Sequence, residues 1–228
     1  MNALLVGYGK MGKSLEQILI SRGHSVVEKF NSQNASELDN LDKTKLNFDL
    51  IFDFTGSFAF CKNYALYLDL GKPVVVGTTG WEESKDRIIE KFRFRGVSII
   101  YGANFSIGVN AFLKCLRFFV EILKKTSYYE AVILETHHSQ KKDSPSGTAK
   151  KMKSLVEDYF PNIQILSARV GSIFGNHAIL LDSQFDTIEL IHQAKSREGF
   201  AIGAVLAGEY LLKNPGVYEF EQVFDRLV

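Results

Sequence analysis

The chain has 228 residues, of which 46% are hydrophobic and 23% are charged, a composition typical of a globular protein with a sizeable core. Its 27 lysines and arginines nearly balance 26 acidic residues, which argues against a dedicated binder of nucleic acid or membrane surfaces. Cys61 and Cys115 are too few for a disulfide framework or a four-cysteine zinc site. With no secretion signal and no apolar stretch of roughly 18 residues, we expect a cytoplasmic protein.

The first half of the chain alternates short apolar runs with helix-like stretches, a pattern that predicts βα units and a parallel sheet. The apolar runs predict strands at residues 3–6, 25–27, 50–54, 74–76 and 97–101. Apolar side chains at helical spacing predict a helix over residues 10–22, and the charged stretch 81–95 predicts an exposed helix.

The second half has a different pattern, with several strand-like segments in series. Strands are predicted at residues 129–136, 164–170, 178–181 and 187–194, and helices at residues 110–125, 147–159 and 200–212. Strands in series with few helices between them favour a mainly antiparallel or mixed sheet, and hence a second domain. This change of pattern alone places the domain border near Asn104.

A glycine pattern stands between the first predicted strand and the first predicted helix. Gly7, Gly9 and Gly12 match Gly-x-Gly-x-x-Gly, the pattern of a dinucleotide-binding turn. The first glycine permits the tight turn, the second lets the backbone approach a pyrophosphate, and the third allows close helix–strand packing. The helix N-terminus adds unpaired N–H groups and a positive dipole end. We therefore expect cofactor contacts from Gly7, Tyr8, Gly9, Lys10, Met11 and Gly12.

The choice between NADH and NADPH rests on the residues after the second predicted strand. Glu28 stands about twenty residues beyond the glycines, where a carboxylate binds both hydroxyls of an adenine ribose. Such a carboxylate favours NADH, because it repels the 2′-phosphate of NADPH. The neighbouring Lys29 could instead pair with that phosphate, or lie in solvent. Both cofactors therefore remain open.

Three further predicted strands end in small and polar residues, at 53–56, 77–80 and 102–105. Ligands of open α/β sheets bind outside the carboxyl ends of the strands, so three such turns around one crevice favour a cofactor site. We expect contacts to the nicotinamide half from Gly77, Thr78, Thr79, Gly102, Ala103, Asn104 and Phe105.

The densest group of chemically active residues lies in segment 135–148, Glu-Thr-His-His-Ser-Gln-Lys-Lys-Asp-Ser-Pro-Ser-Gly-Thr. His137 and His138 end a predicted strand, and histidine titrates near neutral pH. Lys141 can deliver a proton, and a cationic loop beside a helix N-terminus suits carboxylates or phosphates. The lysines could equally be a solvated charge run.

The start of the predicted helix in this segment offers an anion site. Ser146 is suited to cap the helix, and the N–H groups of Gly147 and Thr148 could hold one carboxylate. A pair of adjacent histidines is sometimes a metal site, but we see no acidic or cysteine partner at ligand spacing. We therefore expect no metal.

This segment resembles the signature of the dihydrodipicolinate reductase (4-hydroxy-tetrahydrodipicolinate reductase) family. The resemblance lies in the pattern His-His-x-x-Lys-x-Asp-x-Pro-Ser-Gly-Thr-Ala over residues 137–149. Other segments resemble family motifs in family order, at residues 9–12, 53–55, 77–80, 103–110, 169–171, 175–177, 189–194 and 196–201. The resemblance therefore runs nearly from end to end.

The resemblance implies an α/β fold with an N-terminal Rossmann domain and a mixed α/β domain with an open sheet. It implies a dinucleotide-binding domain of residues 1–104 and 198–228, and a substrate-binding and tetramerisation domain of residues 105–197. The family reduces a cyclic unsaturated dicarboxylate with NADH or NADPH and releases water, in lysine biosynthesis through diaminopimelate. A homotetramer is expected, with no nucleic-acid or membrane partner.

The same resemblance assigns roles within the histidine–lysine segment. His137 is expected to be the acid/base histidine and Lys141 the proton donor, while His138, Gly147 and Thr148 are expected to bind substrate. Two alternatives stay open, namely an oxidoreductase of another small dicarboxylate and a non-catalytic NAD-sensing protein on the same fold. The intact signature speaks against the first, and retention of both His137 and Lys141 speaks against the second, because a sensor needs no proton donor.

Overall fold

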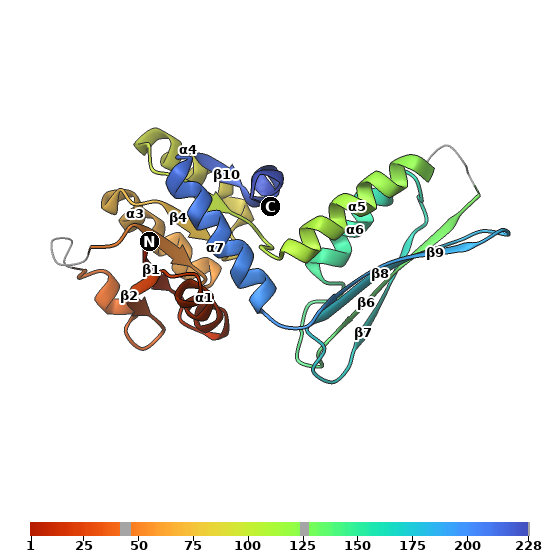
Figure 1. Cartoon of the computed structure of the whole chain (residues 1–228), viewed down its shortest axis with the longest axis horizontal. Coiled ribbons are helices and arrows are strands. Elements are labelled where there is room, and N and C mark those ends of the chain that lie inside the picture. The colour runs from red at the N-terminus through yellow and green to blue at the C-terminus, as the bar shows by residue number, and fades with distance from the viewer. Residues whose placement is uncertain (42–46, 124–127, 228) are drawn as a thin grey trace. The chain divides into compact units, whose positions relative to one another are not determined.

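The computed structural model describes residues 1–41, 47–123 and 128–227, which form two compact units (Figure 1). The first, here called the six-stranded unit, comprises Met1–Ser106 and Glu198–Val228, and the second, the four-stranded unit, comprises Ile107–Arg197. Among the described residues, no helix is long and apolar enough to cross a membrane.

The six-stranded unit contains one parallel sheet with the strand order β10-β5-β4-β3-β1-β2. Its strands are β1 (Asn2–Val6), β2 (Ser25–Phe30), β3 (Leu50–Asp53), β4 (Val74–Val76), β5 (Ile99–Tyr101) and β10 (Val217–Glu219). Its helices are α1 (Lys10–Ser21), α2 (Ala35–Leu38), α3 (Ser57–Leu70), η1 (Glu82–Ser84), α4 (Lys85–Arg95), α7 (Glu198–Lys213), α8 (Phe220–Val223) and η2 (Phe224–Arg226).

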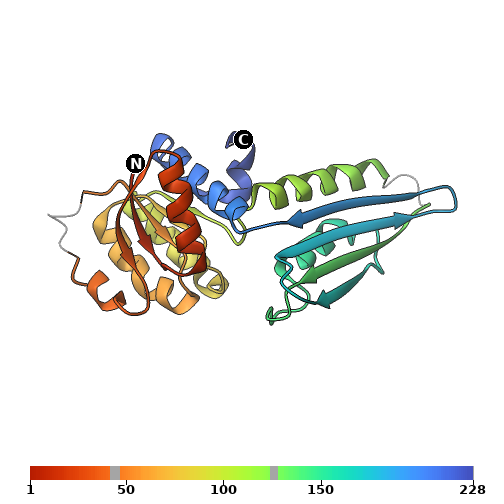
Figure 2. The same ribbon diagram turned by 60° about the horizontal axis from the view of Figure 1, so that its bottom comes forward.

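Helices cover both faces of this sheet, α1 and α7 on one side and α3 and α4 on the other (Figures 1 and 2). Because both faces are covered, the central strands are mostly apolar. All four residues of β3, including Asp53 at its end, and all three of β4 are buried. Gly208 of α7 lets its helix approach β3, since a Cβ there would lie 2.9 Å from the ring of Phe52.

The four-stranded unit is built on a mixed sheet with the order β7-β6-β8-β9, in which β6 and β7 are parallel and the other pairs antiparallel. The strands are β6 (Glu130–His137), β7 (Gln164–Arg169), β8 (Gly175–Asp182) and β9 (Thr187–Ala194). Helices α5 (Ile107–Leu123) and α6 (Gly147–Val156) pack on one face of the sheet (Figure 2). The predicted fold class, a Rossmann-type sheet with a second mixed α/β part, is thereby confirmed.

Several predicted boundaries differ from the structure. The predicted end of the second strand at residue 27 is wrong, because β2 continues to Phe30. The stretch 81–95 is not one helix but a short 3₁₀ turn, η1, followed by α4. Helix α3 and strand β10 were not predicted at all. The end of the helix predicted over residues 110–125 lies outside the described residues.

Candidate active site

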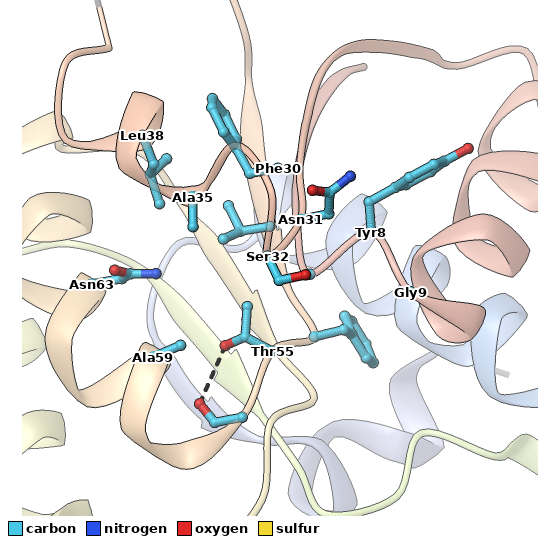
Figure 3. Close-up of a pocket in the computed structure, with 14 residues that line it drawn as sticks. Tyr8, Gly9, Phe30, Asn31, Ser32, Ala35, Leu38, Thr55, Ala59 and Asn63 are labelled. Atoms are coloured by element: carbon cyan, nitrogen blue, oxygen red, sulfur yellow. Dashed lines mark hydrogen bonds between the residues drawn. The ribbon is translucent and has the colours of Figure 1, made fainter.

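A pocket of about 370 Å³ opens at the carboxyl ends of the strands in the six-stranded unit (Figure 3). Ser32 and Thr55, which follow β2 and β3, face it from two sides. The other residues that line it directly after β1, β2 and β3 are Gly7, Tyr8, Gly9, Asn31, Phe54 and Gly56. The pocket therefore stands where open α/β sheets bind ligands.

The glycines of the first turn have the geometry that the sequence pattern predicts. Gly7 has φ +98°, and a Cβ there would lie 2.3 Å from the carbonyl oxygen of Phe54. A Cβ on Gly12 would lie 2.6 Å from the carbonyl oxygen of Gly7, so helix α1 packs tightly on the turn. Gly9 caps α1 without a side-chain hydrogen bond, and a Cβ there meets nothing within 4 Å. The backbone at Gly9 therefore borders open space that a ligand can enter.

The remaining residues of this turn pack beside the pocket. Lys10 is exposed and Met11 half-buried in the first turn of α1, and neither lines the pocket. The hydroxyl of Tyr8 donates to Glu16, which also pairs with Lys29, the two atoms Oε1 and Nζ being 2.8 Å apart. Lys29 is thus tied to α1 and lies over the Tyr8 ring.

Glu28 lies inside β2 rather than after it, and it is exposed and does not line the pocket. Its expected contact with the adenine ribose stays a prediction, although the strand end on which it rested has moved. The residues that follow the actual end of β2 and line the pocket are Asn31 and Ser32. Among the described residues that line this pocket, none is acidic.

A smaller hollow of about 170 Å³ lies at the ends of β4 and β5 in the same unit. Four residues expected to contact the nicotinamide half line it, namely Thr78, Thr79, Gly102 and Ala103. The other three expected residues do not line this hollow, namely Gly77, Asn104 and Phe105. A Cβ on Gly77 would lie 2.0 Å from the ring of Phe54. Phe105 is buried and its ring packs against Phe220.

Buried Asp53 ties the two turns together. Its Oδ1 accepts hydrogen bonds from the hydroxyls of Thr55 and Thr78, both at 2.7 Å, and its Oδ2 accepts one from Tyr67 at 2.6 Å. The Thr78 hydroxyl is therefore engaged within the protein and holds the turn in place. Sequence reasoning noted Asp53 only as part of a turn.

A buried polar cluster occupies the helix-covered face of the sheet in the four-stranded unit. Glu135 and His137 are two residues apart on β6, so both side chains face the helices, and they are 2% and 6% exposed. Glu135 Oε2 lies 2.5 Å from His137 Nδ1, and Glu135 Oε1 lies 2.8 Å from Arg169 Nη2 on β7. His177 on β8 stands opposite Glu135 in the sheet and packs edge-on against the His137 ring.

The loop after β6 and the start of α6 join this cluster. The Ser146 backbone N–H donates to Glu135 Oε1 at 3.3 Å, and Ser146 Oγ accepts from Ala149 N–H and thereby caps α6. Gly147 and Thr148 form the first turn of that helix. An anion placed there would meet the positive end of the helix dipole.

Hydrogen bonds of Asp143 and Arg169 connect Lys141 to this cluster. Its Nζ donates to both carboxylate oxygens of Asp143, at 2.7 and 3.0 Å, and Arg169 Nη2 donates to the Asp143 carbonyl oxygen at 2.7 Å. His138 is half-buried and its carbonyl oxygen accepts from the Lys141 N–H. The structure therefore brings His137, Lys141 and the N-terminus of α6 into one region of one unit.

Burial and charge shift the ionisation of this cluster in opposite directions. Burial by itself raises the pKa of Glu135, but hydrogen bonds from Arg169 and Ser167 and the charges of His137 and Arg169 outweigh it and lower that pKa to about 2. Burial lowers the pKa of His137, against the opposing charge of Glu135. Burial, reinforced by His137, lowers the pKa of His177 to about 4. At neutral pH, Glu135 is thus ionised and His177 is neutral.

Glu135, His137 and His177 also offer ligand-type atoms within 4.8 Å of one another. The expectation of no metal did not consider Glu135, which shares a face of the strand with His137. Arg169 and the Ser146 N–H contact Oε1 of this carboxylate.

Comparison with known proteins gives these features a family. The model described as "Dihydrodipicolinate reductase, N-terminus" matches residues 1–105, and the model described as "Dihydrodipicolinate reductase, C-terminus" matches residues 108–224.

Relatives and a solved structure agree over the full length. The 4-hydroxy-tetrahydrodipicolinate reductase of Christiangramia forsetii is 35% identical over 240 residues, which cover 100% of this chain and 99% of the relative. The enzyme of the same name from Archaeoglobus fulgidus is 32% identical and covers 95% of this chain and 96% of its own. Dipicolinate-bound dihydrodipicolinate reductase from Paenisporosarcina sp. TG-14 has the same fold, with a TM-score of 0.72 at 20% identity over 98% of this chain and 99% of that one. The chain therefore belongs to the dihydrodipicolinate reductase family of NAD(P)H-dependent oxidoreductases.

Proposed function

We propose that the chain reduces 4-hydroxy-tetrahydrodipicolinate to tetrahydrodipicolinate with NADH or NADPH and loss of water, in lysine biosynthesis through diaminopimelate. The observation that carries this is that the ion pairs and hydrogen bonds of Glu135, Arg169 and Asp143 join His137, Lys141 and a capped helix N-terminus. The non-catalytic alternative gains no support from the relatives, because both are named as the reductase and match this chain over nearly its full length.

The six-stranded unit supplies the residues that fit a dinucleotide. The turn around Gly7 and Gly9 suits the pyrophosphate, because open space borders Gly9 and no side chain caps α1. Thr79, Gly102 and Ala103 are suited to the nicotinamide half. When bound, the cofactor supplies a hydride to the substrate ring. We assign cofactor binding to residues 1–104 with 198–228, and substrate binding to residues 105–197.

The four-stranded unit supplies the proton and the anion sites. The 4-hydroxyl group of the substrate leaves as water, which forms a conjugated C=C–C=N system. Hydride addition to one carbon of that system leaves negative charge that a proton must neutralise. Lys141 is the donor in this proposal, and His137 is the acid/base histidine beside it. The N–H groups of Gly147 and Thr148 hold one substrate carboxylate, and His138 contributes to substrate binding. The dipicolinate-bound relative from Paenisporosarcina sp. TG-14 supports a cyclic dicarboxylate as the ligand.

The test is oxidation of NADH and of NADPH, followed by absorbance, with the condensation product of aspartate semialdehyde and pyruvate made in situ. We expect oxidation that depends on this product and that pyridine-2,6-dicarboxylate inhibits competitively. Cofactor binding without any turnover would reject the reductase function and favour the sensor. Turnover that pyridine-2,6-dicarboxylate fails to inhibit would reject the assigned anion sites.

We further propose that the pocket accepts NADPH at least as readily as NADH. Asn31 stands at the end of β2, and its Oδ1 accepts a hydrogen bond from the Gln33 N–H at 2.7 Å. This bond leaves the amide nitrogen of Asn31 as a donor for a ribose or phosphate oxygen. Because none of the described lining residues is acidic, no carboxylate in the pocket repels a 2′-phosphate.

Asn31→Asp is expected to weaken NADPH binding about tenfold or more while leaving NADH binding unchanged or tighter, because it places a negative charge beside the 2′-phosphate. Calorimetric Kd values for both cofactors measure this effect. Glu28→Gln is the matched control, since it removes a carboxylate on the same strand that lies outside the pocket. A change of preference with Glu28→Gln and none with Asn31→Asp would restore Glu28 as the ribose-binding residue.

The open face of the four-stranded sheet supports the proposed homotetramer. The strand registers place Leu166, Leu134, Ala178 and Ile191 in one row across β7, β6, β8 and β9. Leu166, Leu134 and Ile191 are 53%, 38% and 52% exposed, an apolar row on the face opposite α5 and α6. A contiguous exposed apolar patch is typical of a protein–protein contact.

Leu134→Glu is expected to prevent assembly of the proposed tetramer, because it places a charge in the centre of this row. Light scattering after size exclusion measures the mass, which for a tetramer is about four times the 25.7 kDa of the chain. Phe94→Glu is the control, since Phe94 is an exposed apolar residue on α4 of the other unit. A monomeric wild-type protein would contradict the tetramer.

A further inference from the structure

We infer that Glu135 is a positioning residue that holds the acid/base histidine, the proton-donor loop and the substrate-carboxylate site in one arrangement. This inference rests on the proposed function, because it assigns Glu135 a part in the same reaction. Glu135 itself does not act on the substrate; it acts through three neighbours. None of the roles expected from the sequence falls on this residue.

The first observation is that Glu135 is buried and that each of its oxygens lies against a nitrogen of a neighbouring residue. Oε2 lies 2.5 Å from His137 Nδ1, so the carboxylate fixes one edge of the imidazole and leaves Nε2 as the other functional atom. Oε1 receives Arg169 Nη2 at 2.8 Å and the Ser146 N–H at 3.3 Å. An ionised carboxylate with a side-chain exposure of 0% persists only with such partners.

The second observation is where these partners lead. The same Nη2 of Arg169 that contacts Glu135 also donates to the carbonyl oxygen of Asp143, and the carboxylate of Asp143 holds Lys141 Nζ. The Glu135 carboxylate is thus two contacts away from the backbone that places the proton donor. A loop residue such as Lys141 needs an anchor of this kind to stand within reach of a substrate.

The third observation concerns the anion site at α6. Ser146 is the N-cap of α6, and its backbone N–H donates to Glu135 while its Oγ accepts from Ala149 N–H and lies 3.2 Å from His177 Nε2. The N–H groups of Gly147 and Thr148 follow directly. The carboxylate therefore fixes the position of the first helical turn on β6, and with it the proposed carboxylate site.

The charges around His137 make the inference measurable. Glu135 faces it from its own strand, Lys141 from the loop, Arg169 from β7 and His177 from β8. Burial lowers the pKa of His137, and Lys141 and Arg169 lower it further, whereas Glu135 raises it. Removing the charge of Glu135 must therefore lower the pKa of His137.

The test is Glu135→Gln, studied by NMR titration of the imidazole signals in the full chain, which has five histidines. We expect the pKa of His137 to be lower than in wild type, because the carboxylate charge that raises it is gone. We also expect kcat to fall on the order of tenfold and KM for the dicarboxylate to rise, with an unchanged Kd for the cofactor. Glu130→Gln, an exposed glutamate on the same strand, is the control and should alter none of these quantities.

An unchanged His137 titration in folded Glu135→Gln, or unchanged kcat and KM, would overturn the inference. If Glu135→Gln does not fold, Arg169→Gln replaces it, because it keeps the carboxylate and removes its link to Asp143. That variant should raise the pKa of His137 and the KM for the dicarboxylate, and no change in either would overturn the inference. The titration needs no substrate, so failure of the reductase assay in the wild type would reject the proposed function separately.

Discussion

Lys141→Ala is expected to lower kcat by about 10²-fold or more while leaving the Kd of the cofactor nearly unchanged. The reason is that the proton that neutralises the reduced ring comes from Lys141 in the proposed reaction, whereas the pocket around Gly7 and Gly9 belongs to the other unit. Stopped-flow or steady-state oxidation of NADPH measures kcat, and calorimetry measures the Kd. A mutant with normal turnover would remove Lys141 from the mechanism.

Two further variants separate charge from proton donation. Lys141→Arg keeps a cation that can pair with Asp143, but a guanidinium does not give up its proton at neutral pH. We therefore expect Lys141→Arg to retain more substrate affinity than Lys141→Ala and to lose a similar share of kcat. Lys142→Ala, the exposed neighbour, is the matched control and should change kcat by less than about twofold. Equal losses in Lys142→Ala and Lys141→Ala would instead indicate a general effect of loop charge.

Sequence patterns predicted the strands and turns that depend on the residues of one short segment. Apolar runs predicted the positions of β1, β3 and β4, since strands covered on both faces bury apolar side chains along most of their length. The glycine turn was also predictable locally, because few residues other than glycine adopt the φ of +98° found at Gly7. Helix α3 was missed because apolar side chains such as Phe58, 86% exposed, also stand on its outer face and blur the helical stripe.

The parts that sequence reasoning missed depend on contacts between strands distant in sequence. Glu135 stands opposite His177, and His177 opposite His192, only because β6, β8 and β9 pair in one register. No local pattern encodes that register, so the buried carboxylate beside His137 looked like an ordinary strand residue. The alternation of the strand was the one available signal, since it puts Glu135 and His137 on the same face.

The end of β2 illustrates how a small error moves a functional residue. Three more residues of strand, from Glu28 to Phe30, place Asn31 rather than Glu28 directly after the strand, where it lines the pocket. Val27 and Glu28 carry no local signal for a strand end. The pairing of β2 with β1, which reaches Val6 and Phe30, decides where β2 ends. In the proposed function, the residue that decides cofactor preference therefore depends on where the strand ends, and tertiary pairing decides that end.

Gly9→Ala and Gly7→Ala are expected to fail in different ways, and the contrast tests the cofactor pocket. At Gly9 a Cβ meets nothing within 4 Å, so Gly9→Ala should keep its melting temperature and weaken NADPH binding about tenfold or more, because the methyl group fills the space that the pyrophosphate needs. At Gly7 a Cβ would lie 2.3 Å from the Phe54 carbonyl oxygen with φ at +98°, which predicts a loss of stability on the order of 3–5 kcal/mol.

Thermal unfolding followed by circular dichroism and calorimetric titration with NADPH measure the two effects on the same samples. The Cβ of Gly7→Ala would clash with a backbone carbonyl, so no side chain can rotate away to relieve the clash. We therefore expect Gly7→Ala to destabilise the six-stranded unit, and any loss of NADPH binding to follow from that loss of stability. Tight NADPH binding by a stable Gly9→Ala protein would show that the pyrophosphate lies elsewhere. A stable Gly7→Ala protein would show that the turn after β1 can move away from the turn after β3, and would contradict the close packing at Gly7 on which the proposed pocket depends.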